Sequence, residues 1–403
     1  MSTNSSLKTI QDGLVFYFDA NNPKSYIGEP TTNLNKARSD YTGTSYSTDG
    51  EWTSNPTVFT KTYYPNVDTP IGNGATYCVE SGTTGYHHLS TWGGSGESGA
   101  HSISCYVYPI SNNISNFTIG MLNDGGNMVT FDFTTNTITY GGSISNRNAI
   151  MQPLKDWPGW YRVGANIEGR VGGWVGSIGL NVNTSYTPSS PYKSFYITGV
   201  QYEYKDHITQ YVTGSRSNTD GAIDLAKTNS INLSNTAFDS NARITFNNST
   251  SYINTGCILN GSTYTKFAWF NTNNLSAANN IVSGGTNGQH AFWLAVGNKL
   301  NAGHNGSWST VQSSTTISTN TWYFGAASFS TSTGWRLYLN GSMEASSVST
   351  TTFTGTTMPT LIGSYDYGNL FSGTIDMVGI YNKVLSDADV LQLYLRTKSR
   401  YRL

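Results

Sequence analysis

Short apolar runs, separated by clusters of turn-forming residues, recur along the whole chain. Residues 14–18 are a continuous aliphatic and aromatic run, whereas residues 102–108 alternate, with Ile103, Cys105 and Val107 on one side of the pattern. Because successive side chains of a strand point to opposite faces, both patterns predict β-strands. The same features predict strands at residues 128–133, 160–167, 195–202, 267–270, 290–296, 322–329, 335–339 and 374–381.

One helix is expected close to the C-terminus. Ser386 and Asp389 are spaced as in a capping box, and the apolar run 390–395 follows them. Acidic residues at the start of this segment and basic residues at its end suit the helix dipole. Many short strands separated by frequent Gly, Asn and Pro clusters are typical of sandwiches and jelly rolls. The expected fold class is all-β, with two β-sandwich or jelly-roll modules and one short C-terminal helix.

Composition excludes several classes of protein. Charged residues make up 11% of the 403 residues, against about 25% in an average globular protein. Aromatic residues reach 13%, which argues against disorder because disordered chains lack large apolar side chains. The net charge is −1, and a basic stripe occurs only at the C-terminus, so no nucleic-acid partner is expected. No apolar run approaches the roughly 20 residues that span a bilayer, so no membrane insertion is expected.

The N-terminal segment lacks the apolar region of a signal peptide, although the composition is typical of extracellular proteins. Assembly in a cytoplasm followed by lysis, as for virions, would reconcile the two observations. Cys78, Cys105 and Cys257 match no zinc or redox spacing and are interpreted as small buried hydrophobic residues. A disulfide between Cys78 and Cys105 stays open as an alternative. No cofactor and no metal site are expected.

A series of short motifs in one fixed order resembles the laminin-G-like, concanavalin A-like lectin/glucanase family. The motifs lie at residues 242–246, 251–253, 267–270, 320–323, 336–341, 362–364 and 371–386. The resemblance implies that one of the two modules is a concanavalin A-like sandwich.

A narrower resemblance is to virion proteins of tailed bacteriophages. In those proteins a motif like residues 12–26, DGLVFYFDANNPKSY, opens the lectin domain, and an ending like residues 393–403 closes it. Here the opening motif stands far from the other motifs. The implied organisation is a first strand and arm at 1–30, an inserted domain at 31–214 and the lectin-like domain at 215–403. Residues 14–18 should then pair near residues 374–381; the alternative is a free arm or a strand of the first module.

The inserted segment resembles the carbohydrate-binding-module-like jelly rolls of phage fibre proteins. The resemblance is carried by residues 159–163, 195–203 and 208–214. Insertions of this kind are tolerated because the ends of a domain lie at its surface and often close together.

Hydrolysis is poorly supported by the acidic residues. Canonical glycosidases need two carboxylates about 5 to 10 Å apart. The glucanase motif E-x-D-x-x-E is absent, Glu344 is the only glutamate after Glu203, and the segment 374–378 carries Asp376 alone. No nucleophilic triad motif is present either. The chain is therefore expected not to be an enzyme, and no catalytic residue is assigned.

Two glycine-bounded loops, residues 302–308 and 364–369, combine aromatic and polar side chains. Sugars present apolar C–H faces beside hydroxyls, so their sites pair aromatic rings with amide or carboxylate groups. The glycan-binding candidates are His304, Asn305, Trp308, Tyr365, Asp366 and Tyr367. The alternative is that Trp308 and Tyr365 only pack on the rim of the sandwich.

The last residues alternate basic and other side chains. An extended strand would place Arg396, Lys398, Arg400 and Arg402 on one face, where they could dock on an acidic neighbour or add to a sheet edge. The alternative is a solvated, frayed terminus.

The resemblances together favour a non-enzymatic phage virion protein, such as a fibre, head decoration or tail-associated adhesin. The expected partners are other virion proteins, further copies of the chain (a trimer is one candidate) and cell-surface glycans bound weakly through many copies. The expected location is the particle surface, after assembly in the host cytoplasm. A free carbohydrate-binding lectin is the alternative, and a glycanase is a third.

Overall fold

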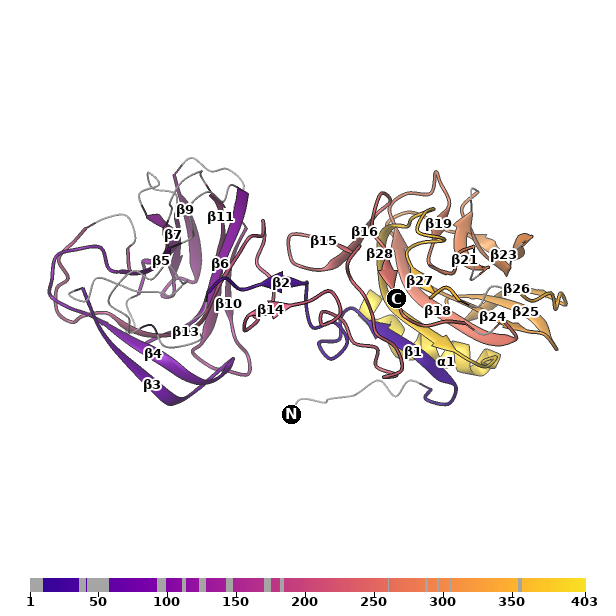
Figure 1. Cartoon of the computed structure of the whole chain (residues 1–403), viewed down its shortest axis with the longest axis horizontal. Helices are drawn as coiled ribbons and strands as arrows, with labels where there is room; N and C mark the ends of the chain where they lie inside the picture. Colours follow the sequence, from indigo (N-terminus) through magenta and orange to yellow (C-terminus); the bar gives the residue numbers. More distant parts are fainter. Residues whose placement is uncertain are drawn as a thin grey trace. The chain divides into compact units, whose positions relative to one another are not determined.

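The chain folds into two compact units (Figure 1). The computed structural model describes residues 10–35, 41, 58–92, 99–110, 114–122, 128–142, 148–169, 175–181, 185–259, 261–286, 289–295, 297–304, 306–353 and 357–403. Unit 1 consists of Met1–Pro30, Ser217–Asp239 and Arg243–Leu403, and unit 2 consists of Thr31–Arg216 with Ser240–Ala242. The chain thus leaves unit 1 after its first strand and returns to it at Ser217, except for the short segment Ser240–Ala242, which belongs to unit 2.

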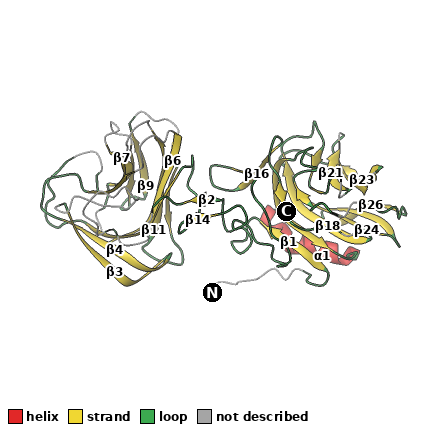
Figure 2. Ribbon diagram, in the orientation of Figure 1, coloured by secondary structure: helices red, strands yellow, loops and turns green. Residues whose placement is uncertain are grey.

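The all-β class with one short C-terminal helix is confirmed, and each strand segment predicted from the sequence lies within an observed strand, to within a residue at its ends; residue 296, predicted in one of them, lies outside the described residues. Figure 2 shows strands throughout both units, with helix confined to the end of the described chain. That helix is α1 (Asp387–Thr397), which continues into the 3-10 turn η1 (Lys398–Tyr401). Among the described residues, no helix is both long enough and apolar enough to cross a membrane.

An eight-stranded antiparallel sheet forms the centre of unit 1. Its main path runs β15-β16-β28-β18-β24-β25-β26, and β1 pairs with β28. The bounds are β1 (Leu14–Asp19), β15 (Ala237–Phe238), β16 (Ile244–Asn247), β18 (Thr263–Thr272), β24 (Tyr323–Ser330), β25 (Gly334–Leu339), β26 (Ser342–Ser347) and β28 (Ser372–Tyr381).

Two smaller sheets complete unit 1. One has the order β19-β21-β22-β23 and the other β17-β27-β20. Their bounds are β17 (Ile253–Asn254), β19 (Asn279–Asn280), β20 (Val282–Ser283), β21 (His290–Ala295), β22 (Lys299–His304), β23 (Ser307–Thr316) and β27 (Leu361–Ile362).

Both faces of the eight-stranded sheet are buried. Along β18, Ala268 and Phe270 face the core shared with the smaller sheets, whereas Phe267 and Trp269 face a second core beneath α1. β1 follows the same alternation, with Phe16 in the first core. Side chains alternate along a strand, so a sheet covered on both faces needs apolar residues at nearly every position. This explains why these strands read as continuous apolar runs.

The first strand pairs with the last one, as the resemblance of residues 12–26 to the opening motif of lectin-like domains implied. Phe16 lies opposite Ile380 and Phe18 opposite Val378 in an antiparallel register, and the two strands lie side by side in Figure 1. β28 also pairs with β18. Residues at the two ends of the chain therefore belong to one hydrogen-bonded layer.

The C-terminal tail is helical and does not form the extended strand that its alternating residues suggested. The predicted capping box is present, with the Ser386 hydroxyl accepting from the Asp389 N–H and the Asp389 side chain accepting in return. The chain then stays helical through Tyr401, because the Tyr401 ring stacks on that of Trp269 with 4.0 Å between the ring centroids.

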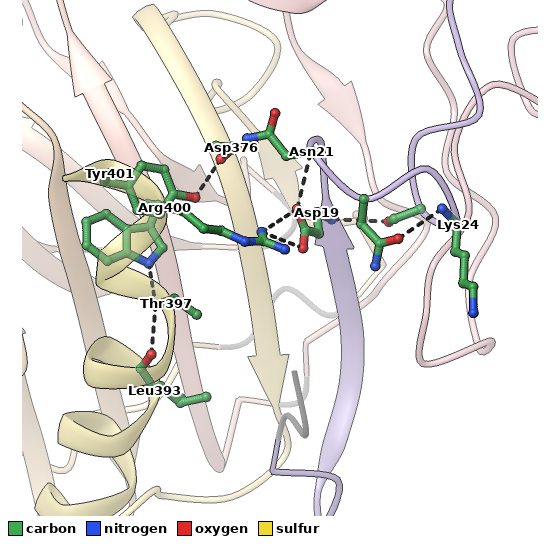
Figure 3. A network of polar contacts seen from close by, with 11 residues as sticks. Asp19, Asn21, Lys24, Asp376, Leu393, Thr397, Arg400 and Tyr401 are labelled. Carbon is green, nitrogen blue, oxygen red and sulfur yellow. Dashed lines mark hydrogen bonds and ion pairs between the residues drawn. The ribbon is translucent and has the colours of Figure 1, made fainter. Parts of the chain in front are cut away.

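The predicted docking cations are therefore not aligned on one face. Arg396 lies in the last turn of α1, Lys398 and Arg400 lie in η1, and Arg402 is its left-handed C-cap. Arg400 is directed at a carboxylate of its own unit (Figure 3). The idea of one cationic docking face was wrong.

A polar network joins the tail to both terminal strands of unit 1. Arg400 donates to the two carboxylate oxygens of Asp19, at 2.9 and 2.8 Å, and Asp19 is buried. The buried carboxylate of Asp376 accepts from the Tyr401 hydroxyl at 2.5 Å and from Asn21 at 2.6 Å. Burial raises the pKa of Asp376, and these two hydrogen bonds oppose the increase. Figure 3 shows this network between the ends of β1 and β28 and the turn after α1.

Unit 2 is a second sandwich. Its sheets have the orders β10-β11-β6-β13-β4-β3 and β5-β12-β7-β8-β9. The bounds are β3 (Phe59–Thr69), β4 (Gly72–Glu80), β5 (His88–Trp92), β6 (Gly99–Pro109), β7 (Phe117–Leu122), β8 (Met128–Asp132), β9 (Thr137–Gly141), β10 (Ala149–Pro153), β11 (Tyr161–Gly169), β12 (Val175–Gly179) and β13 (Ser194–Glu203).

Inward side chains of both unit 2 sheets share one core, which includes Val107 on β6 and Ile119 on β7. The entry and exit segments of the unit, β2 (Thr31–Thr32) and β14 (Ser215–Arg216), pair with each other. The two ends of unit 2 are therefore neighbours, which is the geometry that lets a domain be inserted into another chain.

The three cysteines are free and buried. The alternative of a disulfide between Cys78 and Cys105 is thus not realised. Burial raises the pKa of Cys78 and Cys257 to about 12, so both thiols stay protonated at neutral pH. They behave as the small core residues that the sequence indicated.

The ion pair between Arg400 and Asp19 should be needed for the stability of unit 1. Replacing Arg400 with Met leaves a buried carboxylate unpaired, and we expect a loss of about 3 kcal/mol in the free energy of unfolding. Chemical denaturation followed by near-ultraviolet circular dichroism measures this loss. Arg402→Met, at the exposed neighbouring cation, should cost less than about 0.5 kcal/mol. Equal effects of the two substitutions would contradict a special role for Arg400.

Candidate ligand-binding site

An open pocket lies on unit 1, beside the sheet β19-β21-β22-β23. Its volume is about 180 Å³. The lining combines large aromatic side chains with small and amide-bearing ones: Ala278, Asn280, Ala291, Trp293, Trp308, Tyr365 and Asn369. These residues come from four separate segments of the chain, so only the folded unit brings them together.

Strand alternation explains which side chains of β21 line the pocket. Phe292 and Leu294 belong to the core of unit 1, whereas Ala291 and Trp293 face the pocket. Asn280 on β19 lies opposite Trp293 and therefore shares its face. The Trp293 indole N–H donates to the backbone carbonyl of Trp308 at 3.0 Å, which orients the ring.

A close backbone approach brings Trp308 to the pocket. Gly303 on β22 lies opposite Ala291 on β21. A Cβ atom at Gly303 would lie 2.0 Å from the Ser307 carbonyl oxygen, so any other residue would force β23 away. Glycine permits such contacts because it has no side chain. The hairpin between β22 and β23 thus folds tightly enough for Trp308 to reach Trp293.

The other aromatic wall comes from a two-residue turn after β27. Tyr365 and Gly368 exchange backbone hydrogen bonds of 3.0 and 2.9 Å across it. Asp366 and Tyr367 both have positive φ, 54° and 61°, which is the pattern of a type I′ turn. The Asp366 N–H donates to the Gly284 carbonyl at 3.0 Å, and its carboxylate accepts from Thr286, so the turn is anchored.

The aromatic rings are arranged edge to face. The Trp308 and Tyr365 ring centroids are 5.1 Å apart, with an angle of 69° between the planes. Such a pair leaves one ring face open while fixing the angle of the wall. The Asn280 amide donates to the Asn369 carbonyl at 3.0 Å and accepts from Ser283 at 2.9 Å. The exposed Asn369 amide has no hydrogen bond to the described residues.

The pocket is uncharged at neutral pH. Burial, with a smaller contribution from Asp366, raises the pKa of Tyr365, so its phenol is neutral. None of the described lining residues is a carboxylate, and glycoside hydrolysis needs two. Within the described ranges, no group of three or more His, Cys, Asp and Glu side chains could hold a metal ion. The arrangement is suited to binding a neutral ligand.

The structure separates the predicted glycan-binding residues into groups. Trp308 and Tyr365 meet at the pocket. Asp366 and Tyr367 lie on the same turn but outside the lining, and the Tyr367 ring packs 5.4 Å from that of Tyr252. Asn305 lies outside the described residues.

His304 belongs to the core of unit 1, and its assignment to a glycan site was wrong. Its ring is 3% exposed and lies 4.5 Å from that of Trp335. One ring nitrogen is 2.8 Å from the Tyr264 hydroxyl and the other is 2.8 Å from the Thr351 carbonyl oxygen. His304 has the inward parity of Ala302 on β22, whereas the loop composition had suggested a surface position. Burial lowers the pKa of His304 to about 4.

Sequence reasoning missed Trp293, Asn280 and Asn369. Trp293 was included in a predicted strand but assigned no role. Its neighbours Phe292 and Leu294 are apolar, and alternation places the residue between them on the opposite face. That signal could have identified Trp293. No comparable local signal distinguishes the two asparagines among the many in the chain.

Comparison with protein families gives a match for most of unit 1. Residues 238–391 match the model of the concanavalin A-like lectin/glucanases superfamily. Unit 1 therefore contains a concanavalin A-like domain. No curated protein sequence gives a significant match.

Several solved structures are similar to parts of the chain. Domain 4 of AbnA, a GH43 extracellular arabinanase from Geobacillus stearothermophilus in complex with arabinotriose, is 18% identical over 44% of this chain and 93% of that domain, with a TM-score of 0.35. A SAP-like pentraxin from Limulus polyphemus is 15% identical over 37% of this chain and 80% of that one, with a TM-score of 0.31. A putative carbohydrate binding protein from Bacteroides ovatus is 13% identical over 77% and 79% of the two chains, with a TM-score of 0.31.

The buried His304 should make unit 1 sensitive to acid. Its pKa is about 4 in the folded state against 6.5 for an ordinary histidine, so the unfolded chain binds the proton more tightly. The stabilisation that comes from neutral His304 is therefore complete above the ordinary histidine pKa. It is lost as the pH falls toward 4. Between pH 7 and pH 5 the loss from this residue should be about 2 kcal/mol.

Urea denaturation at the two pH values, followed by tryptophan fluorescence, measures this loss. His304→Gln keeps a polar side chain at the site but cannot titrate, so the acid-dependent loss should shrink by that amount. An unchanged pH dependence in this variant would show that other groups cause the acid sensitivity.

Proposed function

We propose that the concanavalin A-like domain binds glycans without cleaving them, and that Trp293, Trp308 and Tyr365 form its sugar-binding surface. One observation supports this proposal above all. Three aromatic side chains from separate segments converge on an open, uncharged pocket that also presents amide groups. A sugar offers an apolar C–H face to an aromatic ring and hydroxyls to amides, so the pocket matches both parts of its surface.

The size of the pocket limits the ligand. Its volume of about 180 Å³ is below the roughly 300 Å³ at which pockets begin to enclose drug-sized molecules. One or two sugar units of a longer glycan fit this space. Weak binding follows, since few contacts can form, and display of many copies would raise the overall avidity.

The absence of carboxylates among the described lining residues favours binding over hydrolysis. The carboxylate of Asp366, the acid on the turn, already accepts a hydrogen bond from Thr286, and the Asp366 backbone N–H donates to the Gly284 carbonyl. Catalysis would need a second carboxylate across the bound sugar. The glycanase alternative thus has no described pair of groups to perform it.

We further propose that the chain is displayed on a tailed-phage particle as a fibre, a head decoration or a tail-associated adhesin. The support is the resemblance of residues 12–26 to phage virion proteins, a segment that in this chain contains the whole of β1. In this role the units attach to other virion proteins or further copies, and the pocket contacts host glycans. A free lectin is the alternative.

Glycan binding should depend on the pocket aromatics. Trp308→Ala and Tyr365→Ala each remove one wall, and we expect at least a tenfold loss of binding, equal to about 1.4 kcal/mol. A glycan array probed with the full chain identifies the ligand, and titration calorimetry with the best hit measures the loss.

Tyr367→Ala provides the matched control, because Tyr367 is an exposed tyrosine of the same turn that packs on Tyr252. This variant should bind normally. Equal losses at positions 365 and 367, or no glycan bound by the unaltered chain, would contradict the pocket assignment. Release of reducing ends from a bound glycan would instead support the alternative that the chain is a glycanase.

The virion role predicts that the chain copurifies with particles. Mass spectrometry of gradient-purified phage from the lysate that contains this protein should detect its peptides in the particle band at many copies per particle. Peptides found only in the soluble fraction would favour the free lectin.

A further inference from the structure

A row of aromatic side chains crosses the six-stranded sheet of unit 2. Tyr77 on β4 lies opposite Tyr196 on β13, which lies opposite Tyr108 on β6. Trp160, just before β11, extends the row next to Tyr108, and Tyr64 on β3 flanks its other end. The Tyr77–Tyr196, Tyr108–Tyr196 and Tyr108–Trp160 ring centroids are 5.0, 6.5 and 5.7 Å apart.

This aromatic row faces away from the core of unit 2. The sequence neighbours Cys78, Ile197 and Val107 are fully buried in that core, so strand alternation directs the tyrosines to the outer face. Tyr64 is 42% exposed, and the three central tyrosines are half-buried. The row is therefore a surface of packed rings with accessible edges and faces.

The phenol hydroxyls of the row lack partners within the described protein. None of the hydroxyl groups of Tyr64, Tyr77, Tyr108 and Tyr196 makes a hydrogen bond to another described residue. A tyrosine hydroxyl can donate one hydrogen bond and accept another, and buried ones usually do so. Burial raises the pKa of Tyr196, and the hydroxyls of Tyr64 and Tyr77 add to the increase, which places these groups close together. Several hydroxyls thus gather beside stacked rings without protein partners.

The end of the row at Trp160 is rigid. Gly159 has φ of 88°, and a Cβ atom there would lie 2.4 Å from the Tyr108 ring. Glycine is thus required for Trp160 to close against Tyr108. Trp160 itself is only 5% exposed, so it packs against Tyr108 at the end of the row and offers little surface to a ligand. A ligand would meet a surface whose shape is set before binding, which lowers the entropy cost of association.

We propose that this aromatic row is a second binding surface, on unit 2, for an extended neutral polysaccharide. Ring faces repeat along a line, and so do the apolar faces of a sugar chain. The unpartnered hydroxyls supply the hydrogen bonds that a polyol needs, and the row carries no charge at neutral pH. The pocket on unit 1 is too small for a chain, so the two sites differ in the length of ligand that they recognise.

Affinity gel electrophoresis of the full chain tests this surface. The chain carries Trp308→Ala, which disables the unit 1 pocket, and the gels contain dextran, xylan or glucomannan as neutral polymers and alginate as an anionic one. At least one neutral polymer should retard the protein, and alginate should not. Tyr196→Ala should weaken the retardation about tenfold, the effect of losing a central aromatic contact.

Further variants separate stacking from folding defects. Tyr64→Ala, on the edge strand β3, should weaken binding without changing the melting temperature by more than the control does. Tyr196→Phe keeps the ring but loses the hydroxyl, so its retardation should lie between those of the unaltered chain and Tyr196→Ala. The control is Tyr140→Ala, which removes a 50% exposed tyrosine from β9 of the other sheet.

Three outcomes would overturn the proposal. One is the absence of retardation by every neutral polymer, and another is an equal loss in the Tyr140 control. The third is a change of molecular mass in sedimentation on Tyr196→Ala with retardation unaltered, which would assign the face to self-association. Failure of short-glycan binding in the unaltered chain would refute the unit 1 pocket alone and leave this surface standing.

Discussion

Burial of the central sheet of unit 1 on both faces is the constraint from which the rest of that unit follows. One face of β18 packs Ala268 and Phe270 against the smaller sheets, and the other packs Phe267 and Trp269 beneath α1. β1 pairs with β28 and supplies Phe16 to the same core. The first strand is therefore part of the hydrophobic layer, although all of unit 2 separates it in sequence from the strands beside it.

The same constraint explains the charged groups near the chain ends. Covering the second face with α1 and η1 brings Arg400 to the buried end of β1 and Tyr401 to Asp376 on β28. A buried carboxylate without a partner would be costly, so the tail is held where its cation is needed. Arg400, one of the cations that the sequence suggested for a docking surface, instead forms an ion pair that stabilises unit 1.

The pocket lies where this double burial ends. The sheet β19-β21-β22-β23 contributes one face to the core, and its outer face is free to carry Trp293 and Trp308. The aromatic row of unit 2 occupies an equivalent position, on the outer face of a sheet whose inner face is core. In both units the proposed ligand surface is the outward-facing side of a sheet, where aromatic residues stand at positions that strands often fill with hydroxyl-bearing ones. Rigidity of the core beneath is what keeps the rings at fixed spacing.

Local sequence was informative where the physical signal is local. The capping box, the apolar runs of β18 and β28 and the alternation of β6 all follow from side chains within a few residues of one another. Strands such as β23 and β26 went unpredicted because serine and threonine fill them, and backbone pairing with β22 and β25 supplies the stabilisation instead. His304 was misplaced for a related reason, since glycine and asparagine around it suggested a loop.

By itself, then, the sequence determined the all-β class, the helix at the end and the low content of charged residues, whereas the pairing of the first strand with the last was implied by a family resemblance. The first three depend on residue type and periodicity, which are written in the chain. Only the tertiary structure decided that Trp293 joins Trp308 and Tyr365, that His304 is internal and that Arg400 is bound to Asp19. Those outcomes depend on strand register and on the close backbone approach at Gly303, which arise when distant segments pack and leave no trace in local composition.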